Sequence, residues 1–291
     1  MIKVIDFPAE PSFEYVFLNA GRGPGQFYED KLPVHVAQVD LLPDGIDALI
    51  LTADLQGRER FKDPPGRPLR LLGEVLPQLL ANETLPKIDL PNPTRVGVLL
   101  AGDFYTVPLL DKRGGSGDVT SVWRAFAEQF QWVAGVPGNH DLFGEKANAR
   151  TRLPGNAHYL DGTSKQVAGL KIAGLGGIIG NITRPHRRGH DDYFAELQSL
   201  VDTRPDILIM HDGPDGMING KPGLTMAREI LTGSGVPLTV RGHSHWNHPF
   251  AQLGTGEQII NVDCRVVILK GAPLTRFELP LGSEFDAPVG R

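Results

Sequence analysis

The chain has 291 residues, of which 41% are hydrophobic, 22% are charged and one is a cysteine. This length supports one sizeable α/β core, and the lone cysteine excludes an internal disulfide and a multi-thiolate zinc site. The net charge of −5 gives no global basic field that would attract nucleic acid, and no apolar run approaches the ~20 residues of a membrane span.

The first 47 residues form an extension ahead of the first polar motif. They contain two strand-like runs, residues 14–18 and 34–39, on either side of a Gly-rich turn at residues 21–25. The turn does not open a helix, so we do not expect a nucleotide-binding loop. The N-terminus also lacks the apolar core and cleavage site of a signal peptide. We expect a cytoplasmic protein with one domain over residues 1–291, whose extension (1–47) packs on the core or caps it.

Five short apolar runs further along the chain predict buried strands. Each is bounded by Gly, Pro or Asp, as is typical of strands covered on both faces. They are residues 48–51, 96–100, 132–136, 207–210 and 238–240. Apolar spacing of three and four residues predicts helices at residues 69–80, 119–131, 193–201 and 224–231. The mixture predicts an α/β fold.

Each of the five predicted strands is followed by a short polar cluster. The clusters are Asp54-Leu55-Gln56, Gly102-Asp103, Gly138-Asn139-His140-Asp141, His211-Asp212 and Gly242-His243-Ser244-His245. Carboxylate, amide and imidazole groups are the ligands that Mn²⁺, Fe²⁺ and Zn²⁺ accept. Loops at the carboxyl ends of strands are where α/β sheets build their sites. One such residue alone is a turn or cap residue, but the ordered series predicts a two-metal hydrolase.

The order of these clusters resembles the calcineurin-like metallophosphoesterases, whose motifs run Asp-x-His, Gly-Asp, Gly-Asn-His-Asp/Glu, a lone His and Gly-His-x-His. The matching stretch runs from Asp54 to His245. The resemblance implies a four-layer α-β-β-α sandwich of two mixed sheets flanked by helices, with two metals at the strand ends. It implies one metal on Asp54, Gln56, Asp103 and His245, and the other on Asp103, Asn139, His211 and His243. It also implies that His140 assists the leaving group and that Asp141 orients His140.

This assignment is chemically consistent. One carboxylate can span two cations about 3.5–4 Å apart, and such a pair generates a water-derived nucleophile near neutral pH. Asn139 contributes a neutral oxygen, and His140 is free to protonate a departing alkoxide. A simpler interpretation makes Asp141 a turn carboxylate.

Position 56 departs from the family pattern, because the chain has Gln56 where the family has histidine. An amide oxygen is a harder donor than imidazole, so we expect Mn²⁺, with Fe²⁺ or Mg²⁺ as alternatives and Zn²⁺ disfavoured. Either Gln56 is a working ligand, which the complete set of other ligands favours, or that metal position is weak.

Three arginines are candidates for substrate contacts. Arg58 follows the first cluster, and Arg187 and Arg188 lie in a basic segment, residues 183–190, between the third and fourth clusters. Guanidinium groups bind phosphate through paired N–H donors. Basic surface loops are also commonly just solvated. Cys264, in the strand-like run 259–268, is expected to be a packed core thiol.

The leading hypothesis is a dinuclear-metal phosphoesterase that hydrolyses a phosphomonoester or phosphodiester of a small molecule or nucleotide. A nuclease is the first alternative, favoured if the arginines line one groove. A non-catalytic scaffold is the second, and the complete ligand set argues against it. The sequence does not separate monoesterase from diesterase and gives no oligomeric state.

Overall fold

The computed structural model describes residues 2–60, 66–144 and 153–272. The helices are α1 (Leu72–Leu79), a π-helical turn (Leu80–Thr84), α2 (Leu85–Lys87), a 3₁₀ turn (Pro93–Arg95), α3 (Thr120–Gln129), α4 (His190–Asp202) and α5 (Thr225–Leu231). The strands up to the middle of the chain are β1 (Val4–Asp6), β2 (Phe13–Asn19), β3 (Tyr28–Val39), β4 (Ala48–Ala53), β5 (Gly57–Arg58), β6 (Val96–Leu100), β7 (Gly117–Asp118), β8 (Trp132–Gly135) and β9 (Asp141–Leu142). Those that follow are β10 (Ala157–Tyr159), β11 (Thr163–Val167), β12 (Leu170–Leu175), β13 (Ile178–Ile179), β14 (Arg187–Arg188), β15 (Ile207–Met210), β16 (Leu238–Arg241), β17 (Phe250–Gln252), β18 (Gln258–Asn261) and β19 (Arg265–Gly271).

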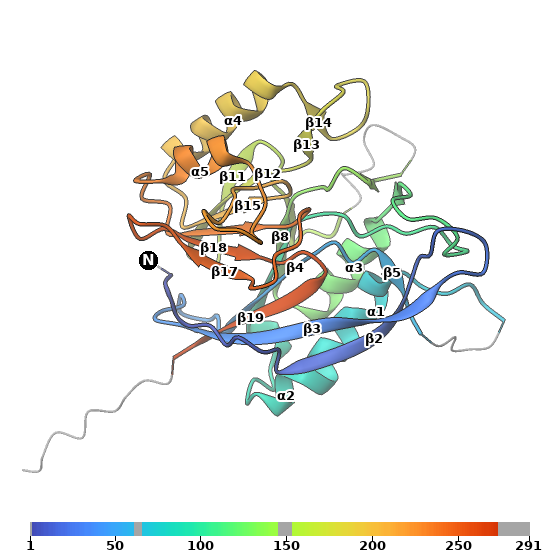
Figure 1. Ribbon diagram of the computed structural model, residues 1–291. Helices are drawn as coiled ribbons and strands as arrows, with labels where there is room; N and C mark the ends of the chain where they lie inside the picture. The colour runs from blue at the N-terminus through green and yellow to red at the C-terminus, as the bar shows by residue number, and fades with distance from the viewer. Residues whose placement is uncertain (1, 61–65, 145–152, 273–291) are drawn as a thin grey trace, which may run out of the picture.

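Within these ranges, nine strands form the first sheet, in the order β10-β8-β6-β4-β19-β3-β2-β5 with β1 paired to β3. Strands β4, β6, β8 and β10 run parallel. The late strand β19 lies between β4 and β3, antiparallel to the first and parallel to the second. The N-terminal extension is therefore joined to the central strands through the end of the described chain (Figure 1).

The second sheet has six described strands in the order β11-β12-β15-β16-β18-β17. Its central strands β12, β15, β16 and β18 are parallel. Parallel neighbours bring their carboxyl ends to one edge of a sheet. The loops after β4, β6 and β8 and those after β15 and β16 are thereby gathered for a common site.

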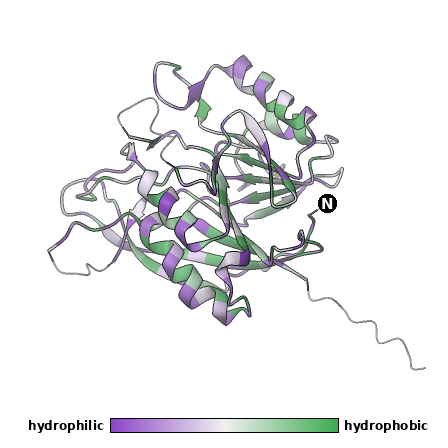
Figure 2. Cartoon of the chain, turned by 180° about the vertical axis from the view of Figure 1, so that it is seen from behind, coloured by the Kyte–Doolittle hydropathy of each residue, from purple (hydrophilic) through white to green (hydrophobic). Residues whose placement is uncertain are grey.

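Side chains that alternate along the strands divide the interior into three apolar layers. Ile50 and Val98 face α1 and α3, whereas Leu49 and Leu99 face the second sheet. On the second sheet, Ile209 points inward toward the first sheet and neighbouring side chains point toward α4 and α5. The result is an α-β-β-α sandwich in which apolar side chains of the helices pack on the sheets. Figure 2 shows apolar and polar residues mixed along the helices.

The predicted four-layer α/β fold and its five core strands are confirmed. The four predicted helices are also present, with α1 passing through Pro77 before the π-helical turn. The run 259–268 is not one strand: β18 and β19 belong to different sheets, and residues 262–264 cross between them. Cys264 lies in this crossing with a φ of 49°, so its expected place within a strand is wrong, although the half-buried side chain does pack against the apolar layer of the first sheet.

None of the helices in the described part of the chain is long and apolar enough to cross a membrane.

Candidate metal centre

The five polar loops meet where the two sheets end. The Asp54 amide donates to the Gly102 carbonyl at 2.8 Å, and the Gly242 amide donates to the His211 carbonyl at 3.1 Å. Asp54, Asp103 and His243 all adopt the left-handed region, with φ of 55°, 61° and 67°. This conformation is uncommon for residues other than glycine, and three such residues in neighbouring loops indicate that surrounding contacts fix the backbone here.

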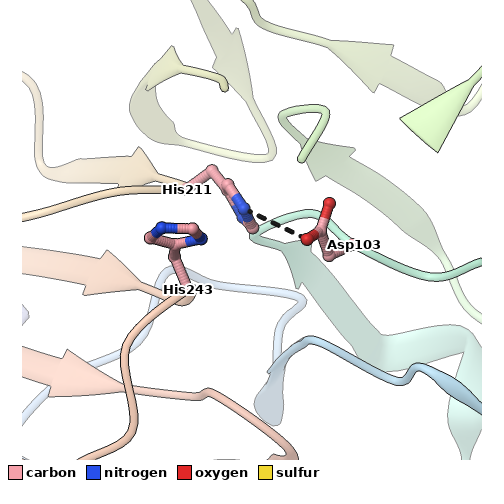
Figure 3. A group of neighbouring side chains, drawn as sticks. All are labelled: Asp103, His211 and His243. Carbon is pink, nitrogen blue, oxygen red and sulfur yellow. Dashed lines mark ion pairs between the residues drawn. The ribbon is translucent and has the colours of Figure 1, made fainter. Parts of the chain in front are cut away.

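Asp103, His211 and His243 form a group in which one ligand atom from each lies within 4.8 Å of the others (Figure 3). The His211 Nε2 lies 3.5 Å from the Asp103 Oδ2 and 3.2 Å from the Asn139 Oδ1. The His211 and His243 rings are 5.0 Å apart between centroids. These are the four residues expected for one of the two metals, and the structure brings them together.

The hydrogen bonding of His211 favours a cation at this position. Its Nδ1 lies 2.8 Å from the Ala101 carbonyl, which can only accept, so Nδ1 carries a proton. The other nitrogen, Nε2, then faces two oxygens that are themselves acceptors. Burial by itself lowers the pKa of His211, but Asp103 and Asp54 together raise it to about 10. A proton or a metal ion at Nε2 stabilises this arrangement of acceptor atoms. A hydrogen bond from the opposite ring nitrogen to a backbone carbonyl is typical of metal-binding histidines.

Two ligands expected for the other metal line the same cavity of about 310 Å³ as Asp103 and His243. The Asp54 carboxylate accepts the His243 amide at 2.8 Å, and the Gln56 amide donates to the Asp103 Oδ2 at 3.1 Å. Burial, and after it the nearby Asp263 carboxylate, raise the pKa of Asp54 well above its usual range. Such a concentration of carboxylates in a partly enclosed cavity suits a divalent cation.

His245, the last expected ligand, lies at the rim with its side chain 57% exposed. Its Nδ1 lies 2.9 Å from the Asp263 Oδ2, and an Arg265 guanidinium nitrogen lies 3.1 Å from both ring nitrogens. The structure places the ring against Asp263, and it is outside the Asp103–His211–His243 group. Sequence reasoning missed Asp263 because a single strand was expected over residues 259–268, with no loop at this position.

The two residues expected to assist the leaving group are placed very differently. His140 is half-buried, lines the cavity, and has its Nδ1 3.4 Å from the Ser116 hydroxyl. Asp141 is fully buried and accepts 2.8 Å hydrogen bonds from the amides of Gly138, Asp103 and Phe104. Burial, opposed only in part by these amides, raises the pKa of Asp141 to about 6. The Asp141 oxygens thus hold two loop backbones together, and its expected role as the orienting partner of His140 finds no contact among the described residues.

Two of the three predicted substrate arginines are used inside the protein. The buried Arg58 donates to the carbonyls of Thr106, Val107 and Leu69. Arg188 pairs with Asp161 at 2.7 Å and Glu196 at 2.6 Å. Arg58 and Arg188 are therefore poorly suited to bind a substrate, because their guanidinium donors are already engaged within the protein. Arg187 lines a second cavity, next to Asn139 and His140, together with Arg184.

A family profile and a solved structure agree with this architecture. The sequence profile of a family described as calcineurin-like phosphoesterase matches residues 46–247. No curated protein sequence matches the chain significantly. Among solved structures, TT1561 of Thermus thermophilus is similar over 75% of this chain and 90% of its own, with a TM-score of 0.52 and 17% identity. A protein of unknown function, AQ665 from Aquifex aeolicus, aligns over 76% of this chain and 95% of its own, with a TM-score of 0.29 and 13% identity.

Proposed function

The chain belongs to the calcineurin-like phosphoesterase family, and from this premise we propose that it hydrolyses phosphate esters of a small molecule or nucleotide with the help of divalent metal ions. The observation that carries the proposal is the convergence of acceptor atoms from Asp103, Asn139 and His211 at one point. A proton or a divalent cation at the His211 Nε2 stabilises this buried cluster, because the two oxygens that face it can only accept. The cavity beside it is open to a substrate.

Two ligand sets are proposed, and Asp103 belongs to both. One set is Asp103, Asn139, His211 and His243, and the other is Asp54, Gln56, Asp103 and His245. We expect Mn²⁺ in preference to Zn²⁺, because the Gln56 amide oxygen is a harder donor than the imidazole it replaces. When bound, such ions polarise the phosphoryl group and lower the pKa of water to near neutrality.

The chain's own groups have separate tasks in this proposal. The Asp103 Oδ1 accepts a 2.8 Å hydrogen bond from the His140 amide. This bond fixes the Asp103 carboxylate relative to the loop that carries His140. The His140 ring lies at the cavity wall, where it can give a proton to the oxygen of a departing alcohol. Asp141 holds the two loop backbones from within the core, and Arg187, which lines the neighbouring cavity, is the proposed contact for a phosphoryl oxygen.

A nuclease is not favoured, because the net charge is −5 and Arg58 and Arg188 are engaged internally. A long nucleic acid needs a continuous basic surface.

The proposal is tested by hydrolysis of p-nitrophenyl phosphate and bis-p-nitrophenyl phosphate. Metal-stripped protein is assayed with and without Mn²⁺, and Asn139→Ala is assayed alongside it. We expect turnover only with Mn²⁺ and a loss of at least a hundredfold in the variant, roughly 2.7 kcal/mol of transition-state stabilisation. Absence of turnover together with absence of bound metal would support the scaffold alternative.

A further inference from the structure

The cavity at the metal centre is one of two that share His140 and Gly114. The first, here called the ring lobe, is about 310 Å³ and reaches from the metal-ligand residues to Tyr28 and Arg113. The second, here called the arginine lobe, is about 320 Å³ and is lined by Ser116, Arg184 and Arg187. His140 therefore stands between two spaces of similar size.

The far wall of the ring lobe is made by the N-terminal extension. The lining residues from this segment are Phe17, Asn19, Ala20 and Tyr28, on β2, on β3 and in the turn that begins between them. The fully buried Phe17 ring lies against Gly57, where an added Cβ would be 2.3 Å from the ring. This close approach brings β2 up to the loop that carries Gln56. The extension is thus part of the site.

Tyr28 and Arg113 present flat groups to this lobe. Tyr28 is 39% exposed, and the Arg113 guanidinium carbon lies over one face of its ring, 5.6 Å from the centroid. Arg113 is held by the Ala20 carbonyl at 3.0 Å and the Tyr28 hydroxyl at 2.6 Å. Both a tyrosine ring and a guanidinium plane stack on flat π-systems such as nucleobases.

The two lobes differ in charge. The ring lobe contains three carboxylates, whereas the charged residues that line the arginine lobe, Arg184 and Arg187, are both cationic. The His140 Nδ1 faces the Ser116 hydroxyl at 3.4 Å, and Ser116 lines this lobe and not the ring lobe. One edge of the His140 ring therefore borders the arginine lobe, while the ring as a whole lines both lobes. A phosphomonoester has a single organic substituent, so it would fill only one of the two lobes, whereas a phosphodiester has a substituent for each.

We propose that the preferred substrate is a phosphodiester whose retained substituent carries a flat ring in the ring lobe and whose leaving substituent lies in the arginine lobe. The inference rests on the proposed function. In the reaction, the oxygen of a water molecule bonds to phosphorus and the P–O bond to the arginine-lobe substituent breaks. His140 supplies a proton to the departing oxygen, and the product retained in the ring lobe is a phosphomonoester.

The test compares three substrates with the same leaving group, in the presence of Mn²⁺. They are p-nitrophenyl thymidine 5′-phosphate, methyl p-nitrophenyl phosphate and p-nitrophenyl phosphate. We expect the thymidine diester to have a kcat/KM about tenfold or more above that of the methyl diester, mainly through KM, because base stacking contributes at this level. We also expect p-nitrophenyl phosphate to be the poorer substrate in comparison with the thymidine diester.

Tyr28→Ala should lower the kcat/KM for the thymidine diester about tenfold more than that for the methyl diester, so that the preference is lost, and Tyr28→Phe should retain the preference. Phe27→Ala is the matched control, since Phe27 is an exposed neighbouring aromatic that does not line the lobe. Inhibition of the wild-type protein by thymidine 5′-phosphate, compared with inorganic phosphate, tests the same contact without a variant and should be about tenfold stronger.

Equal kcat/KM for the two diesters, or a clear preference for the monoester, would overturn this inference while leaving the phosphoesterase proposal in place. A preference that survives Tyr28→Ala would overturn the assignment of the ring lobe. Failure of all three substrates to turn over with Mn²⁺ would overturn the proposed function, and this inference with it.

Discussion

At the scale of single residues, Gln56 is the position that separates this chain from the common family pattern. It lines the cavity of the candidate metal centre, and its amide nitrogen donates to the Asp103 Oδ2 at 3.1 Å, so the side chain lies beside the carboxylate that both proposed ligand sets share. An amide supplies a neutral oxygen, whereas a histidine supplies a softer nitrogen. The identity of this one side chain should therefore influence which metal is preferred.

Gln56→His should raise the affinity for Zn²⁺ relative to Mn²⁺ by about tenfold, because an imidazole nitrogen suits Zn²⁺ better than an amide oxygen does. Competitive titration against a chelating dye measures both affinities. Gln131→His, which adds the same imidazole at an exposed position, is the control. An unchanged Zn²⁺-to-Mn²⁺ ratio in Gln56→His would mean that position 56 does not touch the metal.

At the scale of elements, the site depends on the close approach of the loops after β6 and β8. Gly138 packs directly on Asp103, where an added Cβ would lie 1.9 Å from the Asp103 Oδ1 and 2.4 Å from its amide nitrogen. The Asp141 carboxylate then ties the same two loops through the amides of Gly138, Asp103 and Phe104. These contacts fix Asp103 before any ligand arrives.

Gly138→Ala should force the two loops apart. We expect a loss of about 1–3 kcal/mol in the free energy of unfolding, as for other overpacked sites, and at least a tenfold loss of Mn²⁺ affinity. Chemical denaturation and titration calorimetry measure the two effects. Gly155→Ala is the matched control because no atom lies within 4 Å of its added Cβ. Equal Mn²⁺ affinity in the two variants would contradict the proposed contact between the loops.

The elements were predictable from the sequence where hydrophobicity alone determines them. Residues 48–51 and 96–100 are apolar throughout because β4 and β6 are covered on both faces. The same signal failed at residues 259–268, because two buried strands of different sheets follow one another with only a short crossing between them. The motif order indicated Asp103, Asn139, His211 and His243. Motifs carry no information about Asp263, Arg113 or Tyr28, which reach the cavity only through tertiary packing.

The arginines illustrate a second limit. The sequence of a basic loop does not indicate whether its guanidinium groups point to solvent, to a substrate or to acidic partners. Arg188 pairs with Asp161 and Glu196, which are 27 and 8 positions away. Only the fold decides which cation remains at the cavity.

At the scale of the whole molecule, the extension and β19 join the outer part of the first sheet to the half that carries the candidate metal centre. His35 on β3 lies in this region and is 4% exposed. It contacts the Phe7 ring, which in turn stacks on Phe250 of the second sheet, with centroid separations of 5.8 and 5.4 Å. Burial, and after it the positive charge of Arg265, lower the pKa of His35 from 6.5 to about 4. The His248 ring acts in the same direction.

His35 should make the protein less stable in mild acid. Below pH 6.5 the unfolded chain binds a proton at this residue and the folded protein does not until about pH 4, so stability falls as the pH decreases through this window. Relative to His35→Leu, the wild-type protein should lose roughly 1–2 kcal/mol between pH 7 and pH 5. Urea denaturation at the two pH values measures the difference. His190→Asn, at a histidine whose side chain is 59% exposed, should behave as the wild type. If His35→Leu and wild type lose the same stability, the neutral buried state of His35 is disproved.

The most direct test of the whole account is the rate of bis-p-nitrophenyl phosphate hydrolysis as a function of Mn²⁺ concentration, for metal-stripped wild-type protein and Asp103→Asn. Asp103 belongs to both proposed ligand sets, and the substitution removes its charge with little change in shape. We predict saturable activation of the wild type and a rate at least a hundredfold lower in the variant at every Mn²⁺ concentration. Hydrolysis that proceeds without metal, or an Asp103→Asn protein activated like the wild type, would contradict the assignment of this cluster as a metal-dependent phosphoesterase site.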